Sequence, residues 1–216
     1  MMSDKEQTLS FSPSISFSAK LISVIFHPLV VGVVMAAYLL FIHPSYFIGF
    51  SDKMKMLKLL TVINNNVFFP LLVVALLKGL GFNKSILLPT QKDRIVPYIA
   101  SITFFFWTYY IFRNQPETPR VLVYMCRGMF LAASAALVLN NYYKISMHGI
   151  AVGGLLGLTV VPIYDGTQDS GLPVVIALII SALVVTARRI ASDHHWFDII
   201  SGFILGFICQ LLALWF

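Results

Sequence analysis

Three polar residues near the end of the chain have a spacing suited to chemistry. Five residues separate Arg188 from His194, and three separate His194 from Asp198. A histidine and an aspartate four positions apart share one side of a helix, so the carboxylate can hold one ring nitrogen while the other faces a substrate. An arginine nearby can clamp phosphate oxygens. The neighbouring His195 has Ile199 four positions on, so the register selects His194. The spacing indicates phosphate chemistry.

A second polar group lies in the middle of the chain, where Lys144, Ser146 and His148 alternate with apolar residues. Ser146 is a predicted N-cap, which would bring free backbone N–H groups and the positive end of a helix beside a phosphate. His148 would then lie in the first turn. Taken alone, this pattern equally fits a capping serine followed by a histidine at a membrane interface. A third group, Lys92 and Arg94, precedes another apolar stretch and could add positive charge.

The composition predicts the elements that must position these residues. Hydrophobic residues make up 58% of the 216 and charged residues 11%, whereas soluble domains have about a quarter charged. We therefore expect an all-α integral membrane protein, with a flexible polar tail over 1–19 and one transmembrane domain over 20–216. About seven crossing helices are predicted, at 21–42, 59–77, 95–112, 121–139, 148–164, 172–187 and 199–216.

Seven crossings would bring the three polar groups to the same membrane face. A six-crossing alternative stays open because Arg127 interrupts the fourth stretch, which would then lie in the interface. In that alternative Arg113 and Arg120 would replace Lys92 and Arg94 beside the two histidines. The basic residues do not decide which face is cytoplasmic, since they divide evenly once the proposed site cations are set aside.

Several other classes of function find no support in the sequence. Cys126 and Cys209 lie inside apolar stretches, so neither a disulfide framework nor a thiolate metal site is indicated. The formal net charge of +6 fits either the ordinary basic flanks of membrane helices or attraction to anionic lipid headgroups. No nucleic-acid motif is present, so no nucleic-acid partner is expected. The sequence leaves the oligomeric state undetermined.

The motifs together resemble those of the type 2 phosphatidic acid phosphatase family, whose membrane members share a fold with vanadium haloperoxidases. That family's third motif is Ser-Arg, five residues, His, three residues, Asp. The chain matches its Arg, His and Asp, with Ala187 in place of the serine, and Gly202 follows where the family often has a small residue. The second motif, Pro-Ser-Gly-His, is matched at its Ser and His, while Ile145 and Met147 replace the other two.

The first motif of the family, Lys, six residues and Arg-Pro, is present only in altered form. Lys92, Arg94 and Pro97 supply its residue types at a different spacing, as in divergent membrane members that also have a Lys-Ile-Ser-x-His second motif. Lys144 would then supply charge that the altered motif lacks. The resemblance extends from about residue 92 to residue 202.

The resemblance implies a role for each group. His194 would attack phosphorus to form a phosphohistidine, Asp198 would orient its ring, and His148 would protonate the leaving alkoxide. Neither a metal nor another cofactor is expected. The substrate phosphate would be bound by the cations and the capping serine, which are Arg188, Arg94, Lys92, Lys144 and Ser146.

The implied activity is hydrolysis of a lipid phosphomonoester or diphosphate whose tail stays in the bilayer. Phosphatidic acid, phosphatidylglycerol phosphate and undecaprenyl diphosphate are the family's substrates of this kind. The implied location is the bacterial inner membrane, with the site facing the periplasm. Two alternatives remain: phosphoryl transfer to a lipid or sugar acceptor, and a noncatalytic lipid-phosphate binder or transporter.

Overall fold

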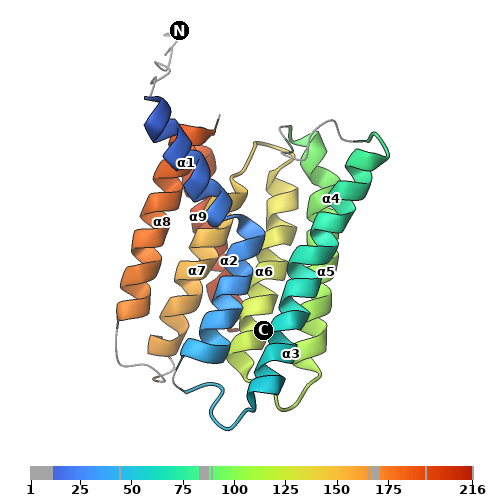
Figure 1. Ribbon diagram of the computed structural model, residues 1–216, viewed down its shortest axis with the longest axis vertical. Coiled ribbons are helices and arrows are strands. Elements are labelled where there is room, and N and C mark those ends of the chain that lie inside the picture. Colours follow the sequence, from blue (N-terminus) through green and yellow to red (C-terminus); the bar gives the residue numbers. More distant parts are fainter. Residues whose placement is uncertain are drawn as a thin grey trace.

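The computed structural model describes residues 12–43, 45–82, 88, 90–164, 166, 171–192 and 194–215, which form an elongated helical bundle without strands (Figure 1). The predicted all-α class is confirmed for these residues. The α-helices are α1 (Pro13–Ile25), α2 (Pro28–Ala37), α3 (Asp52–Ile63), α4 (Phe69–Gly79), α5 (Ile95–Arg113), α6 (Arg120–Leu139), α7 (Met147–Tyr164), α8 (Leu172–Ala191) and α9 (Trp196–Leu212). Two π-helical segments, η1 (Tyr38–Ile42) and η2 (Asn64–Phe68), extend α2 and join α3 to α4, and η3 (Lys92–Arg94) is a 3-10 turn.

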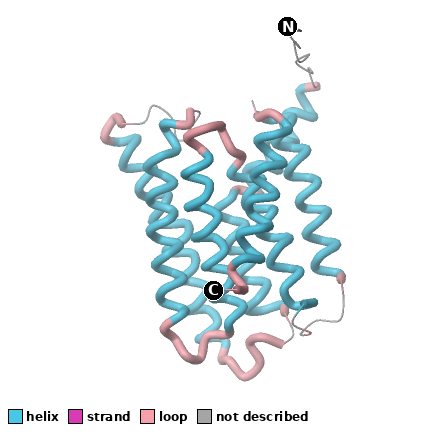
Figure 2. Tube along the Cα trace, turned by 180° about the vertical axis from the view of Figure 1, so that it is seen from behind, coloured by secondary structure: helices cyan, strands magenta, loops and turns pink. Residues whose placement is uncertain are grey.

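Loops gather at the two ends of the bundle, as Figure 2 shows from behind. One end, here called the site end, holds the starts of α5, α7 and α9 and the ends of α6 and α8 (Figure 1). Hydrogen bonds join these segments, because Arg94 donates to the carbonyl of Ile145 and the Ser146 N–H donates to the carbonyl of Asp198. The predicted meeting of the three polar loops at one end of the bundle is thus confirmed.

The predicted flexible tail over 1–19 is wrong in its second part, while residues 1–11 lie outside the described residues. Helix α1 begins at Pro13, where the Ser12 hydroxyl accepts a hydrogen bond from the Ile15 N–H at 3.5 Å. A capping serine followed by proline at the first helical position is a strong helix start, and it outweighs the polar composition of this stretch. The axes of α1 and α2 are bent by 54° at His27, before Pro28, and α1 packs against α8.

Four helices of the described part are long and apolar enough to cross a membrane, at Asp52–Gly79, Lys92–Arg113, Arg120–Leu139 and Leu172–Ala191. The bent pair formed by α1 and α2 adds a fifth if it counts as one span. The apolar stretches of α7 and α9 are shorter. The 17 residues of α9 extend for about 25 Å, less than the roughly 30 Å of a typical hydrocarbon core.

The fourth predicted stretch corresponds to α6, which runs along the bundle and packs against α5 and α9 (Figure 1). Half of its apolar stretch is buried by neighbouring helices. Its Arg127 donates a hydrogen bond to the carbonyl of Ala213 at 2.9 Å and lies over the rings of Tyr109 and Tyr124. These contacts account for an arginine inside an apolar helix.

Helices α7 and α9 pack against each other more closely than any other described pair, since glycines line both surfaces. A Cβ atom on Gly202 of α9 would lie 2.6 Å from the backbone oxygen of Ser146. Contacts of that length do not occur between these atom types, so only glycine permits this approach. The close packing fixes the start of α7 beside the start of α9.

We expect the Gly202→Ala substitution to destabilise the protein by about 1–3 kcal/mol, since the added methyl group must push α9 away from α7. The Gly154→Ala substitution on α7 is the matched control, because its nearest foreign atom would be an ordinary 3.9 Å away. Thermal unfolding in detergent measures the difference. Equal melting temperatures for the two variants would contradict this account of the packing.

Candidate active site

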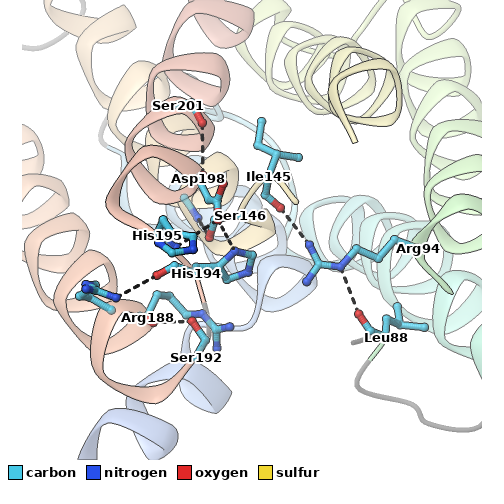
Figure 3. Close-up of polar contacts among 12 residues, drawn as sticks. Leu88, Arg94, Ile145, Ser146, Arg188, Ser192, His194, His195, Asp198 and Ser201 are labelled. Atoms are coloured by element: carbon cyan, nitrogen blue, oxygen red, sulfur yellow. Dashed lines mark hydrogen bonds and ion pairs between the residues drawn. The ribbon is translucent and has the colours of Figure 1, made fainter. Parts of the chain in front are cut away.

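The site begins where α8 ends and α9 starts (Figure 3). His194 is buried with 3% of its surface exposed, and its Nδ1 lies 3.5 Å from Oδ2 of Asp198. These two atoms do not form a hydrogen bond in this geometry, although the two side chains face each other at the distance of an ion pair. Asp198 also accepts a hydrogen bond from the His195 N–H at 3.1 Å, which caps α9. The carboxylate is therefore held by the helix start while it faces the His194 ring.

The register selected from the sequence matches the burial pattern at the start of α9. His194 and Asp198 are buried, whereas His195, Trp196 and Phe197 are exposed. Only one of the two adjacent histidines can therefore take part in a buried site. The ring of His194 presents Nδ1 to the carboxylate, which leaves Nε2 for another partner.

The start of α7 joins the same site through Ser146. The Ser146 hydroxyl accepts a hydrogen bond from the Gly149 N–H at 3.2 Å, as expected of an N-cap. The backbone N–H of Ser146 donates to the Asp198 carbonyl at 3.1 Å. The N-terminus of α7, with its free N–H groups and positive dipole end, is thereby fixed beside the His194–Asp198 pair.

Arg94 is held at the start of α5 by two backbone carbonyls. Its Nη1 donates to the carbonyl of Ile145 at 3.0 Å and its Nε donates to the carbonyl of Leu88 at 3.1 Å (Figure 3). The loop before it is fixed by a reciprocal pair in which the Gln91 and Asn140 side chains each donate to the other's backbone carbonyl, at 2.7 and 2.9 Å. A guanidinium has five N–H donors, so the two bonds to carbonyls leave donors for an anion.

Arg188 approaches His194 from the last turn of α8 (Figure 3). The Ser192 hydroxyl bonds to its backbone carbonyl, while its Nε is buried and makes no hydrogen bond within the described part of the chain. Cations are favoured at a helix C-terminus by the dipole, which offsets part of the cost of burying this group. A half-buried guanidinium whose Nε is buried and makes no hydrogen bond is a ready contact for an anionic ligand.

Positive charge therefore surrounds His194. Burial lowers the pKa of its imidazole below the ordinary value of 6.5, and the charges of Arg94, Arg188 and Lys144 lower it further. Asp198 opposes them and raises the pKa, but the lowering causes dominate. At neutral pH the ring is thus uncharged. With its proton on Nδ1 toward Asp198, it keeps a lone pair on Nε2, which is the form a nucleophile requires.

His148 lies in the first turn of α7, at the same end of the bundle as His194. Its Nε2 is 3.0 Å from the backbone carbonyl of Ser23 in α1, so this nitrogen carries a proton and donates it to that carbonyl. Its ring also meets His27 edge to face, with centroids 5.9 Å apart. The contact with Ser23 was not predicted, because a backbone carbonyl in a presumed apolar stretch gives no signal in the sequence.

From the sequence, His27 directly before Pro28 indicates a helix start or a kink, and the structure shows both. It does cap α2, since its Nδ1 accepts a hydrogen bond from the Leu29 N–H at 3.4 Å. Because its ring contacts that of His148, however, His27 is a third histidine beside the site. The only signal in the sequence was the His27-Pro28 pair. The contact between the His27 ring and His148 of α7 depends on how the helices pack.

The structure brings together most of the predicted site residues but not all of them. Arg94, Ser146, Arg188, His194 and Asp198 surround one position (Figure 3). Lys144 is half-buried, and its charge acts on His194.

Lys92 is the exception, since it is exposed on η3 and does not act on His194. The 3-10 turn directs Arg94 inward and Lys92 outward. The competing pair Arg113 and Arg120 lies at the opposite end of the bundle, at the end of α5 and the start of α6 (Figure 1). This location favours Arg94 over that pair as the basic residue beside His194.

Comparisons with protein-family models, curated proteins and solved structures find no match to this chain. The geometry described above is therefore the main support for a function. Among the described residues, no group of three or more His, Cys, Asp and Glu side chains has the arrangement of a metal site.

We expect single substitutions to move the pKa of His194 in opposite directions. Arg94→Gln removes a positive charge that disfavours imidazolium, so the pKa should rise. Asp198→Asn removes the carboxylate that favours imidazolium, so the pKa should fall. Histidine-selective NMR titration in micelles measures both, with the His194→Gln protein identifying the signal. Arg113→Gln, at the far end, should leave the signal unmoved, and a shift equal to that of Arg94→Gln would contradict this electrostatic picture.

Proposed function

We propose that this protein is an integral membrane phosphatase that hydrolyses a lipid phosphomonoester or diphosphate through a phosphohistidine on His194. The observation that carries the proposal is the meeting of a neutral, carboxylate-facing imidazole with Arg94, Arg188 and Lys144 at one helix N-terminus. Like charges repel, and their gathering in a partly buried site is favourable only when an anion joins them. A phosphate group meets that need, because its oxygens accept several charge-assisted hydrogen bonds at once.

The chemistry follows from the orientation of His194. Its Nε2 lone pair attacks phosphorus, so a P–N bond forms as the bond from phosphorus to the leaving oxygen breaks. The leaving group is the lipid alcohol when the substrate is a phosphomonoester and the lipid monophosphate when it is a diphosphate. Asp198 stabilises the positive charge that develops on the ring, while Arg94, Arg188 and the N–H groups at the start of α7 stabilise the charge on the phosphoryl oxygens. Water then attacks phosphorus, which breaks the P–N bond and releases inorganic phosphate with the restored imidazole.

His148 is the proposed proton donor to the leaving lipid oxygen. To act as an acid, His148 must carry a proton on both ring nitrogens, because a neutral ring that gave up its single N–H would become an imidazolate. In the structure its Nε2–H is bound by the carbonyl of Ser23, so the proton that is transferred is the second one, taken up when the anionic phosphate binds nearby and favours imidazolium. Catalytic hydrogen bonds often form only once a substrate is bound, and a small shift of α1 or of the ring is sufficient. The lipid alcohol or lipid monophosphate would leave with this proton, and the histidine would then accept a proton from the attacking water.

The surroundings of the site favour a lipid over a soluble phosphate ester. An apolar pocket of about 200 Å³ lies between α2, α4, α5, α6 and α7 and is lined at the site end by His27, Leu88 and Met147. Leu88 is also the residue whose carbonyl holds Arg94. A lipid tail in this pocket would therefore have its phosphate beside the basic residues. Seven crossings of a bacterial inner membrane, with the site end toward the periplasm, belong to the same proposal.

A noncatalytic lipid-phosphate binder is the second candidate. The observation that favours it is the hydrogen bond between His148 and Ser23, which occupies the proposed proton donor. Binding needs only the cations and the pocket, whereas hydrolysis also needs His194 as nucleophile. Trapping of the phosphoenzyme by rapid quench separates the two, because a binder forms none.

The detergent-solubilised protein should release phosphate from phosphatidic acid, phosphatidylglycerol phosphate or undecaprenyl diphosphate in the presence of a chelator. His194→Ala should lower the rate by at least about 10³-fold because the nucleophile is lost. Asp198→Asn should lower it by about 10²-fold or more, since the ring loses its orientation and its stabilising charge. His195→Ala should retain most of the rate, because that side chain is exposed and lies outside the buried group around His194.

Thermal unfolding of each variant establishes that the losses are not due to misfolding. Equal rates for the native and His194→Ala proteins would rule out the proposed nucleophile. Appearance of the phosphoryl group on an added lipid or sugar alcohol, detected by mass spectrometry, would instead identify a transferase.

A further inference from the structure

His27 makes two contacts, and capping of α2 explains only one of them. Its Nδ1 accepts a hydrogen bond from the Leu29 N–H at 3.4 Å, where the axes of α1 and α2 are bent by 54°. Asparagine or serine would cap a helix at least as well. What the histidine adds is its ring, which lies edge to face with the ring of His148, the centroids being 5.9 Å apart. The ring contact therefore distinguishes His27 from an ordinary cap.

The cap fixes the orientation of the His27 ring. Because Nδ1 accepts the Leu29 N–H, the ring cannot turn over without losing that hydrogen bond. The side chain is exposed and lines the apolar pocket at the site end, so its neighbours do not enclose it. The cap thus presents an aromatic ring in one orientation to the first turn of α7.

His148 is held by both halves of the bent α1–α2 pair. Its Nε2 is bound by the carbonyl of Ser23 in α1, and its ring packs against His27 at the start of α2. In this arrangement Nε2 carries the proton shared with Ser23, and Nδ1 is left for the second proton, the one that passes to the leaving oxygen. The charge of Arg188 acts on both histidines, so the pair lies beside the cations of the site.

We propose that His27 is a positioning residue for the proton donor of the reaction. Its ring keeps His148 in the orientation in which Nε2 binds Ser23 and Nδ1 is free for the leaving oxygen. The bend between α1 and α2 is then part of the site. This inference rests on the proposed function, because His27 acts through the proton donor of that reaction. The placement of the His148 ring can nevertheless be measured without turnover.

Two substitutions separate the contacts of His27 from each other. His27→Asn retains an acceptor for the Leu29 N–H but has no ring, so it should keep the native melting temperature and lose the positioning of His148. His27→Phe retains the ring but has no acceptor, so it should melt at a lower temperature and keep the positioning. A role limited to capping predicts the reverse: normal behaviour of His27→Asn and a defect in His27→Phe.

Long-range proton–nitrogen NMR spectra of the histidine rings, recorded in micelles at neutral pH, show which nitrogen of His148 carries the proton. His148→Gln identifies the signal. We expect the Nε2–H form alone in the native protein and in His27→Phe. In His27→Asn the ring should also leave the Ser23 carbonyl, so the Nδ1–H form should appear beside it. Ser23→Ala is the matched control and should change nothing, because the acceptor is a main-chain oxygen.

Phosphate release tests the consequence for the reaction. An aromatic pair of this kind favours the packed arrangement by about 2- to 10-fold, so His27→Asn should lower kcat by about that factor. KM should stay nearly constant, because the cations that bind the phosphate are unchanged. His27→Phe should retain the native kcat despite its lower melting temperature.

Two outcomes would overturn the assignment. The Nε2–H form alone in His27→Asn would mean that the bond to Ser23 suffices to hold His148. Equal losses of kcat in His27→Asn and His27→Phe, with raised KM, would mean that a nitrogen of His27 contacts the substrate directly. Failure of the proposed function gives a different result: the native protein releases no phosphate, while the His148 signal still changes in His27→Asn. That result would reject the phosphatase and retain the placement of His148 by His27.

Discussion

The close approach of α7 and α9 is the constraint on which the rest of the site depends. Glycines on both helices let the backbones meet, and the Ser146 N–H then reaches the Asp198 carbonyl. That one bond joins the capped start of α7 to the start of α9, the two segments that supply the dipole, the carboxylate and the buried imidazole. Side chains of ordinary size at these positions would separate the segments. The geometry of the site therefore depends first on the short distance between α7 and α9 that the glycines allow.

The second constraint is the electrostatic cost of placing several positive charges close together. Arg94 and Arg188 are near enough for their charges to oppose each other, and both act on a buried histidine. Backbone carbonyls and a helix C-terminus offset part of this cost, but none of them neutralises the charge. The free protein thus keeps an excess of positive potential at one end of an apolar bundle. Such an arrangement lowers the stability of the free protein, and charged groups perturbed in this way are common at functional sites.

The sequence predicted the parts of the site that depend on local geometry. The spacing of His194 and Asp198 is a helical repeat, and the capping role of Ser146 follows from its position before an apolar run, so both could be read without coordinates. The number of apolar stretches between the three polar loops also predicted that these loops lie at the same end of the bundle. The helical class follows from composition, although only four of the seven expected spans are long and apolar enough by themselves.

The parts that could not be predicted depend on packing between distant segments. Lys92 and Arg94 have the same charge two residues apart, and only the 3-10 turn decides which one faces inward. The start of helix α1 was not predicted, because its many serines are typical of a flexible tail. Ser12 and Pro13 nevertheless form a helix start. The contact between His27 and His148 likewise arises from helices that meet only in the folded chain.

The contact between α1 and His148 has a consequence for how this chain tolerates change. The acceptor is a main-chain oxygen, which every amino acid presents in the same way, so replacement of the Ser23 side chain leaves it in place. Only the path of α1 along α8 matters to the histidine. Residues of α1 are free to vary as long as they remain helical and apolar, whereas an insertion or deletion in that helix would rotate the oxygen away and alter the protonation of a residue more than a hundred positions downstream.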